Sequence, residues 1–363
     1  MMPREGTCRF TDHIRGEMSV AWSSEQDHVI QRADGTVLYN LANVVDDYDM
    51  KITHVIRAEE HLSNTPRQIF ALDALGYPRP EYAHLPFVAE PGSKNKLSKR
   101  KIAQYLKNPD FKKIYEHGKS IVDRLGNTTT AESFNPVLVE FYEKIGYMPE
   151  AILNYLVLLG WSFDDKTEFF TLDEMVENFS LERVNKGSAS FDAKKLLAFQ
   201  EHYYKALPIA EKVERGLPYL QRAGLVADPV PAEARALLTR IVTEAAHRIV
   251  VAGDILDYAD FYLPDDQLVY DEKAVAKHIR KTPDLLKKAM TLLSDLATFD
   301  AASLKNSVDA FTSAESTKLG PVSQMLRVAV TGKDVGFGTF ETMEIVGKEK
   351  CLKRIQRALT QFV

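Results

Sequence analysis

The sequence predicts two architectures in one chain: a mixed α/β fold over about the first 100 residues and an all-α fold in the remainder. Short apolar runs bounded by turn residues, such as residues 52–56, occur in the first part and are typical of buried strands. In the second part the apolar residues instead recur at helical spacing. A chain of 363 residues is also too long for one compact core, so two or three domains are expected.

Composition narrows the possible functions. The 46 Lys and Arg against 51 Asp and Glu give a net charge of −5, which argues against a generally basic nucleic-acid coat but allows a local basic patch. Two cysteines far apart in sequence, Cys8 and Cys351, do not suggest a disulfide framework and fit a reducing compartment. No apolar run has membrane-spanning length, and the first residues lack the apolar core of a secretion signal. We therefore expect a cytoplasmic protein without a membrane segment.

The first predicted element is a β-hairpin. Residues 28–32 and 37–39 flank Asp34-Gly35, a pair typical of two-residue turns. After the hairpin, the hydroxyl of Tyr39 and the amide of Asn40 can orient a small polar ligand. The alternative is that Tyr39 is a buried tyrosine of the core. The acidic run at residues 46–49 either holds Mg²⁺ or is a helix-capping or exposed cluster.

A strand, a turn and a helix then form a predicted α/β crossover unit. Residues 52–56 are expected to be a short buried strand. Thr65 is expected to cap a helix that has Pro66 at its first position and ends at Gly76. Ligands of open α/β sheets bind at the carboxyl ends of such strands, and residues 57–61 fall at that place.

The segment Arg57-Ala58-Glu59-Glu60-His61 is therefore a candidate site. The planar guanidinium of Arg57 is suited to a substrate carboxylate, and Glu60 can accept from a ribose or an amino group. A salt-bridged loop is the alternative. A metal site that includes His54 is the least favoured reading, because the spacing matches no metalloprotease helix motif, and we expect no metal ligands here.

A cationic loop, Lys96-Leu97-Ser98-Lys99-Arg100, follows a turn rich in Gly, Ser and Asn. Such a loop suits the triphosphate of a nucleotide, where charge shifts as a phosphoryl bond breaks. A solvated lysine-rich surface loop is the alternative. No Gly-rich Walker loop, Gly-x-Ser-x-Gly elbow or Cys-x-x-Cys pair occurs, so nothing indicates nucleophilic catalysis.

Beyond residue 100 the pattern predicts helices. Pro149 is expected to open a helix that closes at Gly160 and has one apolar face, formed by Ile152, Tyr155, Leu156 and Leu159. A capping box at Thr171 and Glu174, with Phe170 and Met175 as a hydrophobic staple, predicts the start of another. Further apolar helix faces are predicted at Leu238, Ile241, Val242, Ala245 and Ile249, at Leu285, Leu286, Ala289, Leu293 and Leu296, and at Leu352, Ile355 and Leu359. Pro229 and Pro231 predict a break.

The last 46 residues carry an excess of positive charge. Eight cations stand against four carboxylates, and the cations are Lys318, Arg327, Lys333, Lys348, Lys350, Lys353, Arg354 and Arg357. This excess predicts a basic face able to neutralise phosphates, and a solvated helix side is the alternative.

These pieces, in this order, resemble one family closely: bacterial-type glutamyl-tRNA synthetase, a class I aminoacyl-tRNA synthetase. The resemblance spans nearly the whole chain and rests on residues 34–36, 39–42, 44–47, 52–57, 60–66, 83–86, 96–100, 149–155, 159–161, 191–192, 326–332 and 347–349. Each segment alone is weak evidence, whereas the ordered set is specific.

The resemblance implies a partial Rossmann-type nucleotide-binding domain at residues 1–100 with a remnant of the acceptor-stem insertion, a helical stem-contact region at 101–204 and a helical anticodon-binding domain at 205–363. It also implies the reaction. Glutamate and ATP, used with Mg²⁺, form glutamyl-adenylate, and glutamate then passes to the terminal ribose of tRNA(Glu). A cytoplasmic monomer is expected.

The family's functional residues can be carried over to matching positions of this chain. The loop at 96–100 resembles the class I Lys-Met-Ser-Lys-Ser loop with leucine in place of methionine, which makes Lys96, Ser98, Lys99 and Arg100 the catalytic candidates. The ATP-binding candidates are Glu60, His61, Val88, Lys96, Leu97 and Lys99. The glutamate-binding candidates are Tyr39, Asn43 and Arg57, and the tRNA-binding candidates are Arg327, Lys353, Arg354 and Arg357.

The chain departs from the family pattern in four places. The signature His-x-Gly-His is missing, and the resemblance begins partway through the family pattern, near a strand at Thr7-Cys8-Arg9-Phe10. We therefore expect a truncated chain or a late gene start. We also expect a sheet with an exposed edge and an activity that depends on the missing part. Ala58 replaces the usual glycine. Residues 102–139 are longer than the family norm and suggest an inserted surface element. Near residues 335–338 the usual Ser-Pro is missing.

Two alternatives remain. A non-catalytic tRNA-binding protein derived from a synthetase would explain the missing His-x-Gly-His beside an intact helical half. A glutaminyl-tRNA synthetase relative is disfavoured, because that branch has a β-rich anticodon region whereas residues 205–363 are predicted to be helical.

Overall fold

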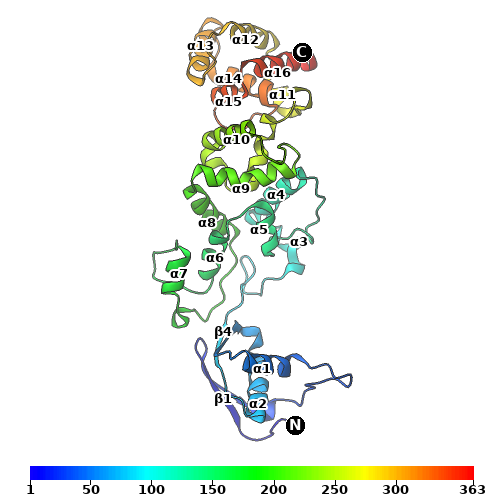
Figure 1. Cartoon of the computed structure of the whole chain (residues 1–363), viewed down its shortest axis with the longest axis vertical. Helices are drawn as coiled ribbons and strands as arrows, with labels where there is room; N and C mark the ends of the chain where they lie inside the picture. The colour runs from blue at the N-terminus through cyan, green and yellow to red at the C-terminus, as the bar shows by residue number, and fades with distance from the viewer. The chain divides into compact units, whose positions relative to one another are not determined.

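The computed structural model describes residues 1–363 and divides into two compact units (Figure 1). The first unit comprises Met1–Tyr115, Asn135–Leu138 and Pro149–Phe199, and the second comprises Glu116–Phe134, Val139–Met148 and Gln200–Val363. The boundary falls inside two helices, α4 (Pro109–Arg124) and α8 (Ala193–Ala206). The division into three parts at residues 100 and 204 stays a prediction.

The first unit holds the only sheet. Its strands are β1 (Thr7–Asp12), β2 (Gly16–Ala21), β3 (His54–Ala58) and β4 (Glu81–Leu85), in the order β2-β1-β4-β3. β1 pairs antiparallel with β2, and β4 pairs in parallel with both β1 and β3. The strand predicted at residues 7–10 is confirmed as part of β1. The strand predicted at residues 52–56 begins two residues later, at His54, and it is not buried: Ile52 and Ile56 are exposed, because β3 lies at the edge of the sheet. The apolar pattern did not predict β2 or β4.

Each face of the sheet has its own apolar cluster. One cluster contains Cys8, Phe10, Ile69 and Tyr82, and the other contains Ile14, Ala83, Trp161, Phe170, Met175 and Val184. Ile69 belongs to α2 (Thr65–Leu75), so this helix covers the first face. Neighbouring side chains of a strand point to opposite faces. The paired residues Arg57 and His84 therefore lie on the face of α2, and the pair His54 and Glu81 lies on the other.

Helix α2 confirms the crossover prediction at its end and corrects it at its start. Gly76 ends the helix in the left-handed conformation (φ 70°), which glycine adopts without strain. Asn64 occupies the N-cap position and Thr65 is the first helical residue. The Thr65 hydroxyl does not cap the helix, because it is bonded instead to Arg57 and His84 in the site described below.

The predicted hairpin is wrong except for its turn. The amide of Arg32 donates to the carbonyl of Thr36 at 2.8 Å, and Gly35 has a φ of 88°. Only one isolated bridge connects the two sides, and Tyr39 begins helix α1 (Tyr39–Asp49) instead of ending a strand. Apolar side chains beside the turn are exposed. A two-stranded ribbon without a covered face is marginal in water, which explains its shortness.

The remaining helices that lie wholly in the first unit are α3 (Ile102–Tyr105), α6 (Pro149–Val157) and α7 (Leu172–Asn178). The capping box of Thr171 and Glu174 is confirmed, and Phe170 and Met175 lie in one buried cluster. Helix α6 ends before Gly160, contrary to the prediction. The carbonyl of Gly160 accepts from the amide of Asn185 at 2.7 Å, and this pairing takes the chain out of the helix.

Residues 102–139 are not the surface element that was expected. Within the first unit, Phe111 of α4 is buried and packs edge-on against Tyr105 and Phe191. Within the second unit, the ring of Phe134 lies 4.3 Å from that of Phe141. Both ends of the segment therefore contribute to packed cores, which its charged composition did not reveal.

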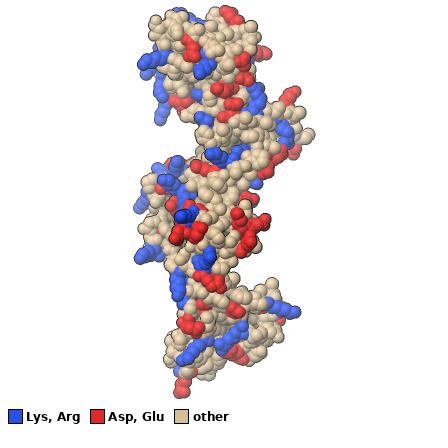
Figure 2. All heavy atoms as spheres, turned by 90° about the vertical axis from the view of Figure 1, so that its left-hand side faces the viewer, with Lys and Arg blue, Asp and Glu red and all other residues tan.

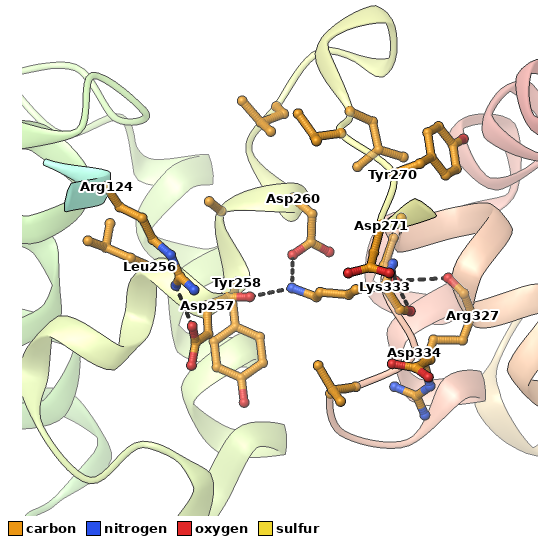
Figure 3. Close-up of a pocket in the computed structure, with 18 of the residues that line it drawn as sticks. Arg124, Leu256, Asp257, Tyr258, Asp260, Tyr270, Asp271, Arg327, Lys333 and Asp334 are labelled. Carbon is orange, nitrogen blue, oxygen red and sulfur yellow. Dashed lines mark hydrogen bonds and ion pairs between the residues drawn. The ribbon is translucent and has the colours of Figure 1, made fainter. Parts of the chain in front are cut away.

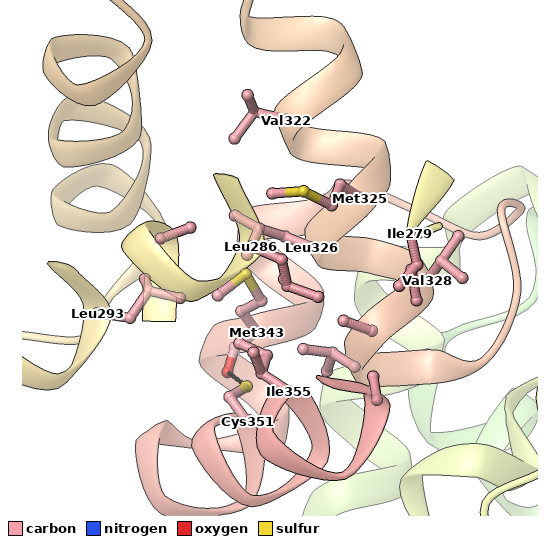
Figure 4. Close-up of a cluster of buried hydrophobic side chains, with 14 of the residues drawn as sticks. Ile279, Leu286, Leu293, Val322, Met325, Leu326, Val328, Met343, Cys351 and Ile355 are labelled. Carbon is pink, nitrogen blue, oxygen red and sulfur yellow. Dashed lines mark hydrogen bonds between the residues drawn. The ribbon is translucent and has the colours of Figure 1, made fainter. Parts of the chain in front are cut away.

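The second unit is all-helical. Besides parts of α4 and α8 it contains α5 (Val139–Ile145), α9 (Ile209–Arg222), α10 (Ala232–Ala245), α11 (Glu272–His278), α12 (Pro283–Asp295), α13 (Ala301–Ala314), α14 (Leu319–Thr331), α15 (Thr339–Val346) and α16 (Lys348–Phe362). The predicted faces on α10, α12 and α16 are largely confirmed, although Ile249 follows the end of α10. Side chains of α11 to α16, including Leu286, Leu326 and Ile355, form one buried cluster (Figure 4). No helix in either unit has the length and apolar composition needed to cross a bilayer.

A histidine–carboxylate pair connects α4 to residues 250–254 of the second unit. His117 Nε2 lies 2.5 Å from Asp254 Oδ1, and Asp254 Oδ2 accepts the amides of Val250 and Val251. Burial alone would lower the pKa of His117, but the hydrogen bond and charge of Asp254 outweigh it and raise the pKa above its ordinary 6.5. The protonated histidine therefore stabilises the fold.

This raised pKa predicts a pH-dependent contribution of His117 to stability. The contribution is fully present below pH 6.5 and is lost as the pH rises through the folded-state pKa. We expect His117→Gln to lower the free energy of unfolding more at pH 5.5 than at pH 8.5. These two pH values lie about one to two units on either side of the ordinary histidine pKa. Urea unfolding followed by circular dichroism measures the difference. An equal loss at both pH values would contradict the assignment.

Candidate functional site

Arg57 lies near the carboxyl end of β3, next to its register partner His84 on β4. Its Nη2 donates to Thr65 Oγ1 at 2.9 Å and to Gln68 Oε1 at 2.7 Å, and its Nε to His84 Nε2 at 3.2 Å. Nη1 is 3.4 Å from the hydroxyl of Tyr39. Neighbouring elements thus hold the guanidinium in one orientation, with the Tyr39 side exposed.

A buried carboxylate supports this arginine from behind. Asp12, at the end of β1, accepts from His84 Nδ1 at 2.5 Å, and both side chains are inaccessible to solvent. Asp12 also accepts the backbone amides of Ile14, Arg15 and His84. Burial alone would raise the pKa of Asp12, but the hydrogen bonds from Arg15, His84 and Ile14 together lower it, so the carboxylate stays ionised.

The protonation state of His84 follows from these partners. Burial is the main cause of the lowered pKa of His84. The hydrogen bond and the charge of Asp12 raise this pKa, whereas the positive charges of Arg57 and Arg15 lower it further. A neutral His84 that donates Nδ1–H to Asp12 leaves Nε2 as an acceptor for Arg57 and for the hydroxyl of Thr65. The chain Asp12–His84–Arg57 is therefore satisfied at each link. Sequence reasoning missed Asp12, and His84 entered it only within the resembling segment 83–86.

Helix α1 brings two more predicted residues to the same place. Tyr39 begins the helix and Asn43 lies one turn later, on the same side. The side-chain oxygen of Asn43 is buried and has no hydrogen-bond partner, which is costly unless a ligand supplies one. Asp47 follows one turn further. Burial raises its pKa, and the positive charge of Arg57 partly opposes this rise.

The cationic loop reaches the turn after β3. Lys96 forms an ion pair with Glu60, three residues beyond Arg57, and the hydrogen bond from Lys96 is the main cause of the lowered pKa of Glu60. The amide of Leu97 donates to the carbonyl of Val88 at 2.8 Å, which fixes the base of the loop. The structure therefore brings the cationic loop to the turn after β3.

The other loop residues are placed by their backbone. The amide of Ser98 donates to the hydroxyl of Tyr105 at 3.0 Å, and the carbonyl of Lys99 accepts from Asn135 Nδ2 at 2.9 Å. The side chains of Lys99 and Arg100 remain exposed. This arrangement holds the backbone still and leaves two cations available to an anionic ligand.

The two glutamates after β3 differ in their surroundings. Glu59 is half-buried and bonded to Arg15 Nη2 at 2.5 Å, so it has the salt-bridged role given as the alternative for this segment. Glu60 is exposed, and it pairs with Lys96 and, at 3.8 Å, with Nε2 of His61. His61 places its ring 5.8 Å from that of Tyr39. The turn after β3 therefore contains one structural and one accessible carboxylate.

A second candidate site is a cleft of about 1000 Å³ in the helical unit (Figure 3). Two cations at its wall are paired, Arg124 with Asp257 and Lys333 with Asp260. Arg327 also lines the cleft, is 7% exposed, and has an Nε without a hydrogen-bond partner. Burial is the main cause of its lowered pKa. A buried cation with an unused donor can contact an anionic or polar ligand.

Arg354 corrects the prediction of a basic tRNA-binding face. It is 0% exposed, and its Nε donates to Asp265 Oδ1 at 2.7 Å. Its other nitrogens donate to the carbonyls of Val330, Asp260 and Leu263. An arginine with its donors used inside the fold does not contact a phosphate, so we assign it a structural role.

The neighbouring cations of α16 are also largely engaged. Arg357 donates to the carbonyls of Asp265 and Leu268, and Lys350 to that of Phe261. Lys353 is exposed and pairs with Glu349 on the same helix at 2.7 Å. On the face drawn in Figure 2, basic and acidic side chains are interspersed. Of the four predicted tRNA contacts, Lys353 is accessible and Arg327 lines the cleft, whereas Arg354 and Arg357 hold the fold.

Two family profiles match the chain. Residues 1–132 and 131–198 match the family described as tRNA synthetases class I (E and Q), catalytic domain. Residues 210–359 match the family described as anticodon binding domain. Together the matches cover both units, including the first site and the cleft around Arg327.

Individual relatives give the same result. The chain is 34% identical over 359 residues to a glutamate–tRNA ligase from Moorella thermoacetica, with 98% of this chain and 66% of the relative aligned. It is 38% identical to one from Thermobifida fusca, with 99% and 69% aligned. A crystal structure of a glutamate tRNA ligase from Elizabethkingia meningosepticum in complex with its amino acid has a TM-score of 0.76 and 28% identity, and the match covers 100% of this chain and 68% of that one. The chain thus spans about two thirds of the length of these relatives.

Proposed function

Since the chain belongs to the class I (E and Q) tRNA synthetases, we propose that it carries out, or forms part of the protein that carries out, the ligation of glutamate to tRNA(Glu). In the first step an α-carboxylate oxygen of glutamate bonds to the α-phosphorus of ATP, and the bond to pyrophosphate breaks. In the second step the terminal ribose hydroxyl of the tRNA bonds to the acyl carbon, AMP leaves, and the hydroxyl proton is released.

Arg57 is the proposed anchor for a carboxylate of glutamate. Its exposed side faces Tyr39, and the Asp12–His84 pair fixes its orientation before the substrate arrives. Pre-ordered donors lose little entropy on binding, which favours recognition of a planar carboxylate. Asn43 supplies a buried oxygen that needs a donor, and the amino group of the substrate would satisfy it.

The loop at residues 96–100 is the proposed phosphate-binding element. Lys99 and Arg100 would stabilise the charge that develops on the departing pyrophosphate. Lys96, now paired with Glu60, would exchange that partner for a phosphate, and the released Glu60 would accept from the ribose. His61, Val88 and Leu97 complete the proposed adenosine side. Mg²⁺ would enter with the triphosphate, because the first site offers several cations and few carboxylates free to bind it.

The cleft around Arg327 is the proposed contact for unpaired anticodon bases, which can be splayed and bonded at their edges. Lys353 is retained as a phosphate contact. A monomer, and the division into catalytic, stem-contact and anticodon-binding parts at residues 100 and 204, also belong to this proposal.

The observation that supports the proposal is the ion pair between Lys96 and Glu60, which brings the cationic loop to the turn that follows Arg57 and the end of β3. The glutaminyl alternative is less favoured, because that branch has a β-rich anticodon region. Here all four strands lie before residue 86, and residues 210–359, which match the anticodon binding domain, are helical.

The test is glutamate- and tRNA-dependent exchange of pyrophosphate into ATP. Because the sequence contains no His-x-Gly-His, the chain is measured alone and after fusion to an upstream segment bearing that motif from a matched ligase. We expect Arg57→Ala in the active form to lower kcat/KM for glutamate by roughly 10- to 100-fold, the equivalent of one charged hydrogen-bonded contact. Lys99→Ala should lower kcat to a similar degree. Lys94→Ala, an exposed lysine in the preceding turn, is the control and should have little effect.

The second candidate is a non-catalytic tRNA-binding protein, and the missing His-x-Gly-His favours it. Filter binding of tRNA(Glu) against other tRNAs at several salt concentrations tests this function independently of catalysis. A fusion that stays inactive while the chain prefers one tRNA would support the second candidate. Loss of both exchange and tRNA preference would overturn both candidates.

A further inference from the structure

A cluster of two histidines and a glutamate lies outside the proposed substrate site. His13 directly follows β1, His54 is the first residue of β3, and Glu81 is the first residue of β4. One ligating atom from each residue lies within 4.8 Å of those from the other two. His54 and Glu81 occupy the amino-terminal ends of β3 and β4, on the face opposite to Arg57 and His84, and His13 lies beside them. The three residues therefore take no part in the proposed ligation.

The sheet itself brings these three side chains together. His54 and Glu81 are register partners in the parallel pair β3 and β4. His13 is fixed beside them because its backbone amide donates to the carbonyl of Tyr82 at 2.8 Å. The backbone of the sheet therefore places the three residues side by side.

The donor atoms are arranged around one point. Glu81 Oε2 contacts Nε2 of His13 and lies 3.5 Å from Nε2 of His54. The two imidazole rings are stacked with centroids 6.0 Å apart. His54 Nδ1 is 2.9 Å from Thr53 Oγ1, and a proton donated there would leave the Nε2 lone pair free toward Glu81. A hydrogen bond of this kind orients metal-binding histidines.

We propose that His13, His54 and Glu81 bind a borderline divalent cation of the Zn²⁺ class. Two imidazoles and one carboxylate are a common donor set for Zn²⁺, with bonds of about 2.0–2.2 Å, and a fourth position would hold water. All three side chains are exposed enough for an ion to enter and for small rotations to close the distances.

The consequence of binding is mechanical. The ion would connect the β1–β2 turn to the starts of β3 and β4, and so tie the edge strand β3 to the centre of the sheet. An ion that binds only the folded state stabilises it in proportion to its concentration over the dissociation constant. The site is placed for stability of the sheet and not for catalysis.

Titration of the metal-free, tag-free full chain with ZnCl₂, followed by isothermal calorimetry, tests the proposal. We expect one Zn²⁺ per chain and a higher midpoint of thermal unfolding, reversed by EDTA. His13→Ala and His54→Ala should each weaken binding by at least about tenfold, and Thr53→Ala by about tenfold through the orientation of His54. His247→Ala, an exposed histidine of the helical unit, is the control. Both cysteines are buried and do not compete.

Replacement of Zn²⁺ by Co²⁺ adds a spectroscopic readout, because four-coordinate Co²⁺ absorbs strongly in the visible range. Glu81→Gln keeps the side-chain volume and gives an independent test if a histidine variant does not fold, as judged by circular dichroism. No saturable binding by the parent chain, or equal affinity in the parent, His54→Ala and Glu81→Gln, would overturn the proposal.

Discussion

Replacing Arg354 by methionine should lower the free energy of unfolding of the helical unit by about 3–5 kcal/mol, the usual cost of removing one partner from a buried ionic network. Methionine has a similar length but no donors. It would leave the carbonyls of Val330, Asp260 and Leu263 without the hydrogen bonds that the guanidinium supplies. Asp265 would lose its cation. The expected loss is a large part of the stability of an ordinary domain.

The neighbouring residue on the same helix supplies a matched control. Lys353 is exposed and pairs only with Glu349 one turn away, an arrangement worth about 0.3–0.5 kcal/mol. Lys353→Met should therefore leave the urea unfolding curve, followed by circular dichroism, almost unchanged. If tRNA binding is measured in parallel, Lys353→Met should weaken it and reduce its salt dependence. Similar stability of the two variants would show that Arg354 is not the structural residue assigned here.

Replacing Asp12 by alanine should destabilise the first unit to a comparable degree, by about 3–5 kcal/mol. The substitution removes the acceptor of His84 Nδ1 and of three backbone amides, two in the turn between β1 and β2 and one in β4. It also frees His84 to rotate, so Arg57 would lose one of its supports. A rise in KM for glutamate in the active fusion protein is the expected second effect.

Tryptophan fluorescence reports this prediction selectively, because both tryptophans, Trp22 and Trp161, belong to the first unit. Asp12→Ala should shift the fluorescence transition in urea to lower concentration. Asp49→Ala is the control, since Asp49 is exposed at the carboxyl end of α1, where a negative charge does not favour the helix. A fluorescence midpoint unchanged by Asp12→Ala would contradict the role given to the buried pair.

The parts of the site that sequence reasoning found depend on local order along the chain. Arg57 was expected at the end of a strand because an apolar run precedes it and a capped helix follows. The cationic loop was visible as five consecutive residues. Both expectations needed only neighbouring positions, and β3, α2 and the loop follow them.

The parts that sequence reasoning missed depend on contacts between distant positions. Asp12 and His84 are 72 residues apart and meet only because β1 and β4 are neighbours in the sheet. Thr65 was expected to cap a helix, but two tertiary partners take its hydroxyl. The same limit explains why Arg354 was taken for a surface cation: its spacing on α16 does not reveal the carbonyls that surround it.

The sequence by itself determined the family, the succession of an α/β part and a helical part, and the residue types at the ends of β3 and in the cationic loop, because these are carried by composition, periodicity and ordered motifs. Only the tertiary structure decided which charges are accessible and which are structural. Burial and hydrogen bonding depend on the elements that pack around a side chain, and in this chain those elements come from segments tens of residues away. This is why neighbouring charges differ in role: Lys353 and Glu60 are accessible, whereas Arg354 and Glu59 are structural. It is also why His13, His54 and Glu81 meet.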